Sequence, residues 1–102
     1  MRVIVVCGAG ASSTFVAHRL RRTAASRGIA LDARPTSMSQ LATELEDADV
    51  LLVGAHLGAQ LHELRALADA ASVPIAILPE TVAAGDGRAA LDLALETHGA
   101  AS

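Results

Sequence analysis

The chain has 102 residues, of which 52% are hydrophobic and 19% charged, and its formal net charge is −3 with the histidines neutral. This length and composition predict one globular domain over residues 1–102. A nucleic-acid binder is excluded, because no basic run exceeds Arg21-Arg22 and Phe15 is the sole aromatic residue. No apolar run is long enough for a membrane span or a signal peptide, so we expect a cytoplasmic protein without membrane insertion.

The composition also limits the core and the redox chemistry. Alanine occupies 23 positions and lysine none, which favours helices packed closely on a sheet of Val, Ile and Leu. The single cysteine, Cys7, forms no internal disulfide, and a structural zinc site is not expected without a second thiolate. Cys7 is therefore either an inert core residue or a reactive one.

The first two elements are predicted from a change in apolar pattern. Residues 3–7 form a continuous apolar run that ends in small residues, which predicts a central parallel strand buried on both faces. A helical pattern follows over residues 13–27, with Ser12 or Ser13 as the expected N-cap and Gly28 just past its end.

Three more strands and three more helices are expected downstream. Residues 29–34 alternate between apolar and polar and precede Pro35, which predicts an edge strand closed by a turn. The run at 50–54 is also wholly apolar and ends in glycine, so we expect a second buried strand that lies beside the first. The remaining elements are a short helix over 38–46, a helix over 55–71, a strand over 74–79 and a helix over 88–98.

Alternating strands and helices of this kind predict an α/β fold with three layers. The sheet is expected to be open, parallel and four-stranded, in the order 2-1-3-4, with helices on both faces because parallel neighbours need right-handed crossovers. Ligands of such sheets bind at the carboxyl ends of the strands, near the point where the strand order reverses. The residues after the first strand are therefore the expected site.

The segment after the first strand has the composition of a phosphate cradle. Small residues let backbone amides converge, the hydroxyls of the following residues can donate hydrogen bonds, and the amino end of a helix favours negative charge. The same field lowers the pKa of the Cys7 thiol, which makes its thiolate a competent nucleophile. The predicted site is the nucleophile Cys7 followed by a phosphate-binding loop of Gly8, Ala9, Gly10, Ala11, Ser12, Ser13 and Thr14.

Two other interpretations of this loop fit less well. A dinucleotide fingerprint would need a third glycine, and the chain is too short for a second mononucleotide-binding half. A cysteine phosphatase would need an arginine six residues after the cysteine to clamp the phosphate, and Ser13 stands there. A loop that holds phosphate but hydrolyses it poorly suits a phosphate carrier.

The sequence resembles the lactose/cellobiose-type IIB subunits of the bacterial phosphoenolpyruvate-dependent sugar phosphotransferase system (PTS). The resemblance covers nearly the whole chain. It rests on three motifs, which are Cys7-Gly8-Ala9-Gly10-Ala11-Ser12-Ser13-Thr14, Ala48-Asp49-Val50-Leu51-Leu52-Val53-Gly54 and Gly85-Asp86-Gly87. It implies that Cys7 accepts a phosphoryl group from a histidine of a IIA protein and passes it to a sugar bound by the membrane protein IIC, with no metal or cofactor.

The sequence leaves the roles of His56 and of the basic first helix undecided, and it allows two alternative functions. Relatives commonly have proline and glutamine where Ala55 and His56 follow the third strand, so His56 either hydrogen-bonds the phosphoryl group or is an exposed residue at a helix start. The basic first helix either docks an acidic partner or is a solvated surface, and the other three histidines are expected at the surface. A small cysteine-dependent phosphatase and a regulatory module phosphorylated on Cys7 are the alternative functions. The sequence specifies neither the sugar nor the oligomeric state.

Overall fold

The computed structural model describes residues 1–6, 10–54, 57, 60–79, 85 and 87–101, with the backbone alone for 10–13 and 100–101. In chain order the elements are β1 (Arg2–Val6), α1 (Gly10–Ser26), β2 (Asp32–Thr36), α2 (Leu41–Glu44), the 3-10 turn η1 (Leu45–Asp47), β3 (Val50–Gly54), α3 (Leu61–Ala70), β4 (Ile75–Leu78) and α5 (Arg88–Ala101).

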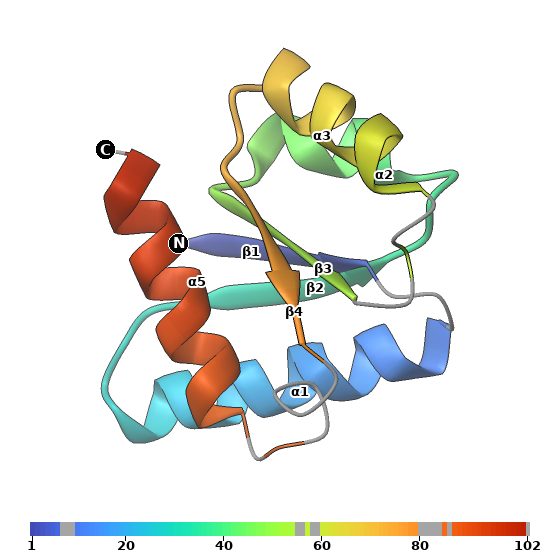
Figure 1. Ribbon diagram of the computed structural model, residues 1–102. Coiled ribbons are helices and arrows are strands. Elements are labelled where there is room, and N and C mark those ends of the chain that lie inside the picture. The colour runs from blue at the N-terminus through green and yellow to red at the C-terminus, as the bar shows by residue number, and fades with distance from the viewer. Residues whose placement is uncertain (7–9, 55–56, 58–59, 80–84, 86, 102) are drawn as a thin grey trace.

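The strands form one parallel sheet in the order β2-β1-β3-β4. Helices α1 and α5 cover one face, and α2 and α3 cover the other, so the molecule has three layers (Figure 1). The predicted fold class and strand order are confirmed. In register, β1 pairs with β2 from Arg2 opposite Asp32 to Val6 opposite Thr36, and with β3 from Val3 opposite Val50 to Val6 opposite Val53.

The two central strands are buried on both faces, and their alternate residues build two separate cores. In β1, Val3 and Val5 pack into the core under α1 and α5, whereas Ile4 and Val6 pack into the core under α2 and α3. All four side chains have 0% exposure. An uninterrupted apolar run is therefore required here, since a polar residue at any of these positions would be buried without water.

Alanine is concentrated where α1 and α5 meet the sheet and each other. Ala17 and Ala24 of α1 and Ala90 and Ala94 of α5 are at most 2% exposed and belong to the same core. Such small side chains let the helix backbones approach the strands and one another closely. The alanine-rich composition thus corresponds to close packing of helices on the sheet, as predicted.

The start of α1 differs from the sequence prediction. The helix begins at Gly10 rather than Ser13, so Ser12 and Ser13 lie inside its first turn and the prediction that one of them is the N-cap is wrong. Its other end is as predicted. Gly28 has φ +71°, and the Ile29 amide donates to the Ala24 carbonyl at 2.9 Å, which together terminate the helix.

Other boundaries shift as well: β2 begins at Asp32 rather than at residue 29, and the helix predicted over 38–46 is α2, followed by the 3-10 turn η1. Pro35 does not end the second strand but lies within β2 opposite Val5, which is tolerated because β2 is an edge strand. The helix predicted from residue 55 begins at Leu61. Leu57 before it and Leu64 within it are buried, and residues 55–56 and 58–59 lie outside the described residues. The last helix extends three residues beyond the predicted end.

A glycine contact fixes the start of α5 against α1. Gly87 has φ +101°, and a Cβ built on it would lie 2.7 Å from the Arg19 carbonyl oxygen and 2.8 Å from Thr23 Oγ1. Only glycine fits both this conformation and this approach. The close contact brings the first turn of α5 directly onto the middle of α1.

We therefore expect Gly87→Ala to destabilise the protein by about 1–3 kcal/mol, because alanine meets both backbone strain and a steric clash. Gly99→Ala is the matched control, since a Cβ at Gly99 in α5 would meet nothing within 4 Å. That control should leave stability unchanged or raise it by about 0.5–1 kcal/mol. Urea unfolding curves of the two variants test this difference, and equal midpoints would contradict it.

Candidate functional site

The carboxyl ends of the three neighbouring strands β2, β1 and β3 meet at one edge of the sheet. Val6 ends β1 and lies between Thr36 of β2 and Val53 of β3 in the register. The chain crosses from β1 to β2 on one side and from β3 to β4 on the other, so the strand order reverses between β1 and β3. This edge is the expected ligand site of an open parallel sheet.

The predicted phosphate-binding segment spans the end of β1 and the start of α1. Cys7, Gly8 and Ala9 lie outside the described residues, as does His56. Gly10 through Thr14 are helical rather than a loop, and they form the first turns of α1. The backbone amides of Gly10, Ala11 and Ser12 accordingly have no partner four residues earlier within the helix, which leaves these N–H groups for capping or for a ligand.

Thr36, the last residue of β2, also lies at this edge. It is 7% exposed, and it is the buried polar side chain among the residues described. Its hydroxyl donates to the Ser37 carbonyl at 3.5 Å, which is long for a hydrogen bond. Alternation along β2 would place Thr36 on the face of Asp32 and Arg34, opposite to the buried Ala33, so the strand period does not predict its burial.

The rim of this edge carries an exposed aromatic side chain. Phe15, in the second turn of α1, is 60% exposed, although it is the sole aromatic residue of the chain. A large apolar group at the surface is notable beside a predicted reactive site. The helical pattern gave no indication of this, because Val16, next to it, is the residue that faces the core.

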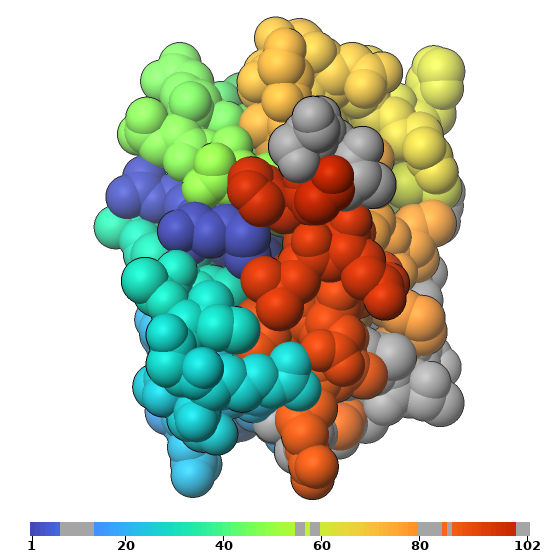
Figure 2. All heavy atoms as spheres, turned by 90° about the vertical axis from the view of Figure 1, so that its left-hand side faces the viewer, coloured from blue at the N-terminus to red at the C-terminus, as the bar shows by residue number. Residues whose placement is uncertain are grey.

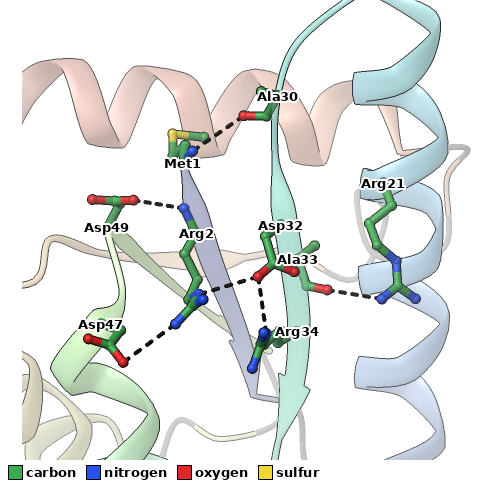
Figure 3. Close-up of polar contacts among 9 residues, drawn as sticks. All are labelled: Met1, Arg2, Arg21, Ala30, Asp32, Ala33, Arg34, Asp47 and Asp49. Atoms are coloured by element: carbon green, nitrogen blue, oxygen red, sulfur yellow. Dashed lines mark hydrogen bonds and ion pairs between the residues drawn. The ribbon is translucent and has the colours of Figure 1, made fainter.

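A second polar cluster lies at the opposite, amino-terminal edge of the sheet (Figure 3). The Arg2 side chain contacts Asp32 at 3.3 Å and Asp47 at 3.5 Å, and the Arg2 amide donates to an Asp49 carboxylate oxygen at 2.7 Å. Arg34 also contacts Asp32, at 3.1 Å. These contacts join the start of β1 to β2 and to the segment that leads into β3.

This cluster lines an open hollow of about 740 Å³, but its charges balance. Three carboxylates face two guanidinium groups and the amino group of Met1, which itself donates to the Ala30 carbonyl at 3.3 Å. Each polar group therefore has a partner within the protein. We interpret the cluster as a device that holds β1 in register with its two neighbours.

The structure also shows where the other three histidines lie and which arginines of α1 have partners. His18 and His62 are exposed and His98 is partly buried, and no group of three metal-ligating side chains occurs in the part of the chain that the structure describes. Of the arginines on α1, Arg21 donates to the Ala33 carbonyl at 3.2 Å and Arg27 pairs with Asp92 at 2.7 Å. Arg21 and Arg27 thus have intramolecular roles.

Comparison with known protein families identifies the chain. The model of the family "PTS system, Lactose/Cellobiose specific IIB subunit" matches residues 2–93. The chain belongs to this family. It is accordingly a phosphocarrier of a sugar phosphotransferase system and acts as a phosphotransferase, and the cysteine phosphatase alternative is not favoured.

Solved structures agree on the fold. The lactose-specific IIB domain from Streptococcus pneumoniae has a TM-score of 0.82 at 15% identity, covering 95% of this chain and 96% of that one. The cellobiose-specific IIB protein from Borrelia burgdorferi has a TM-score of 0.79 at 24% identity, covering 100% and 94%. A search of curated proteins gives no match. None of the described helices combines the length and apolar character of a membrane span.

We expect Arg2→Met to lower stability by about 1 kcal/mol, because it removes two partly exposed ion pairs while retaining the apolar part of the side chain. Arg65→Met, an exposed arginine of α3, is the control and should change stability by less than about 0.5 kcal/mol. Urea unfolding at low and high salt measures both. A loss in Arg2→Met that does not shrink with salt would rule out the ion pairs as its cause.

Proposed function

We propose that Cys7 is the residue that carries the phosphoryl group in this IIB protein. Three observations support the assignment. Cys7 is the sole thiol of the chain, it follows the last residue of the central strand β1 directly, and it precedes the helix α1 by three residues. The family match supplies the reaction class, and residues 1–102 act as one IIB domain.

The transfer consists of two displacements at phosphorus. In the first, the Cys7 thiolate attacks the phosphohistidine of the IIA protein in line, so that a sulfur–phosphorus bond forms while the nitrogen–phosphorus bond breaks and its electron pair stays on the imidazole. In the second, a hydroxyl oxygen of the sugar bound to IIC attacks the same phosphorus. The sulfur–phosphorus bond then breaks, the thiolate is regenerated, and the hydroxyl proton goes to a base or to water.

The protein contributes position and charge stabilisation rather than further covalent chemistry. The first-turn amides of α1, at Gly10, Ala11 and Ser12, are free of helix hydrogen bonds and can donate to the phosphoryl oxygens. The amino end of α1 favours both the thiolate and the transferred dianion, and for this reason lowers the pKa of the Cys7 thiol. Ser12, Ser13 and Thr14 would add hydroxyl donors.

The proposal also gives His56 a role and names the partners of the transfer. His56 follows β3, the neighbour of β1, by two residues and would donate a hydrogen bond to the phosphoryl group. The partners are a IIA protein as donor and a IIC permease with its bound sugar as acceptor, which gives a cytoplasmic protein that meets the membrane through IIC. A regulatory module would use the same phosphorylated Cys7 without passing the group to sugar.

We expect the chain to gain the mass of one phosphoryl group when it is incubated with IIA, phosphoenolpyruvate and the enzymes that phosphorylate IIA. Cys7→Ser should gain none, because an unactivated hydroxyl is a far weaker nucleophile than the thiolate. Intact-mass spectrometry measures the gain, and iodine should remove it from a thiophosphate. Phosphorylation of Cys7→Ser to the level of the parent chain would exclude Cys7 as the acceptor.

A further inference from the structure

The end of β2 holds a buried hydroxyl group whose hydrogen bond is long. Thr36 is 7% exposed, and it is the sole buried polar or charged side chain among the residues that the structure describes. Its Oγ1 donates to the Ser37 carbonyl at 3.5 Å, whereas hydrogen bonds of hydroxyl groups are commonly about 2.7–2.8 Å long. Burial of a hydroxyl costs free energy unless a good hydrogen bond compensates for it, so the position of Thr36 calls for an explanation.

The Ser37 carbonyl does not depend on this bond. It also accepts a hydrogen bond from the Gln40 amide at 3.1 Å, in the turn that leads to α2. The carbonyl therefore keeps a partner when the Thr36 hydroxyl turns away from it. A hydroxyl has one proton to donate, and this proton rotates about the C–O bond. Thr36 can thus donate to another acceptor with little effect on the turn.

The side chain of Thr36 lies beside β1. Thr36 pairs with Val6 of β1, and the Val6 side chain is 0% exposed in the core under α2 and α3. Paired residues of neighbouring strands direct their side chains to the same face of the sheet, so the Thr36 hydroxyl is on the Val6 side of β2. Arg34, two residues earlier on the same face, is exposed. Burial on this face of β2 is therefore confined to the end of the strand nearest to the proposed phosphoryl site.

Covalent continuity limits the distance between Thr36 and the proposed phosphoryl carrier. Val6 is bonded directly to Cys7, and neighbouring parallel strands such as β1 and β2 lie about 4.8 Å apart. Because consecutive Cα atoms are about 3.8 Å apart, the Cα atoms of Thr36 and Cys7 are separated by no more than about 9 Å, whatever course the chain takes after Val6. A threonine side chain and a phosphorylated cysteine side chain can together span this distance.

We propose that the Thr36 hydroxyl donates a hydrogen bond to the phosphoryl group on Cys7 and thereby favours the phosphorylated form of the protein. This inference rests on the proposed function, because it takes Cys7 as the phosphoryl acceptor. A phosphoryl group has three negatively charged acceptor oxygens, and hydrogen bonds to such an anion are shorter and stronger than bonds between neutral groups. The buried hydroxyl would then exchange a long hydrogen bond for a short one. The same bond must break when the group leaves for the sugar, so Thr36 stabilises the carried state.

The test measures the phosphorylation equilibrium between the IIA protein and four forms of this chain, which are the parent, Thr36→Val, Thr36→Ser and Thr97→Val. Each form is mixed with an equal amount of phosphorylated IIA without phosphoenolpyruvate, and intact-mass spectrometry gives the phosphorylated fraction of both proteins. Thr36→Val removes the hydroxyl and keeps a branched side chain, whereas Thr36→Ser keeps the hydroxyl and removes the methyl group. The pair separates hydrogen bonding from packing. Urea midpoints of the unphosphorylated forms report on the fold.

Thr97→Val is the matched control, because it makes the same chemical change far from the site. The Thr97 hydroxyl donates to the Leu93 carbonyl at 2.7 Å within α5. Figure 2 views the end of the molecule at which the last turns of α5 lie beside the first residues of the chain. This is the amino-terminal end of the strands, whereas Thr36 lies at their carboxyl-terminal end.

We expect Thr36→Val to lower the equilibrium constant for phosphoryl acceptance by about tenfold or more, because a hydrogen bond to a charged group is lost. Thr36→Ser should stay within about threefold of the parent and Thr97→Val within about twofold, because both retain the bond. The urea midpoint of unphosphorylated Thr36→Val should equal or exceed that of the parent, since only a long hydrogen bond is removed.

Three results would overturn the role of Thr36. The first is acceptance by Thr36→Val at the level of the parent. The second is an equal loss in Thr36→Val and Thr36→Ser, which would assign the effect to packing. The third is a clearly lower urea midpoint for unphosphorylated Thr36→Val, because the hydroxyl would then serve the fold of the unphosphorylated protein.

The two proposals fail in different ways. If the parent chain accepts no phosphoryl group from a IIA protein shown to be phosphorylated, the proposed function fails and the role of Thr36 fails with it. If the parent accepts the group and Thr36→Val matches Thr97→Val, the phosphoryl carrier role stands and the role of Thr36 alone is rejected.

Discussion

The burial of β1 and β3 on both faces is the constraint from which the rest of the structure follows. A strand whose alternate residues enter two different cores needs a helical layer on each side of the sheet. Parallel pairing then requires crossover helices and brings all carboxyl ends to one edge. Because β1 and β3 are neighbours although α1 and β2 separate them in sequence, the strand order reverses between them, at the end of β1 where Cys7 follows.

The two ends of the parallel strands differ in the hydrogen-bond and ion-pair partners of their polar groups. At the amino-terminal edge, the Arg2 side chain forms ion pairs with Asp32 and Asp47, and its backbone amide donates to Asp49. These polar groups therefore have partners within the protein. At the carboxyl-terminal edge, the first-turn amides of α1 have no acceptor within the helix. The ion pairs hold the register at one end of the strands, and the proposed phosphoryl site lies at the other end.

Most of the fold was predictable because the strands carry strong local signals. Residues 3–6 and 50–53 are uninterrupted apolar runs, and Gly28 marks the end of α1 through its positive φ. The start of α1 was not predictable in the same way. Glycine, alanine and serine at positions 10–13 show no apolar period, so the sequence pattern indicates a helix only from the point at which Val16, Ala17 and Leu20 enter the core.

The proposed phosphoryl site and the packing of α5 on α1 could be predicted from the sequence to different degrees. Cys7 and the small residues after it are local in the chain, so their chemistry was visible in one octapeptide. The contact between α1 and α5 instead depends on one glycine with positive φ, Gly87, which lies against the Arg19 carbonyl. The basic character of α1 was evident from the sequence, but only tertiary packing shows that Arg27 pairs with Asp92 and that Arg21 donates to the Ala33 carbonyl. α1 thus begins beside the proposed phosphoryl site, and its contacts with Gly87 and Asp92 hold it against α5.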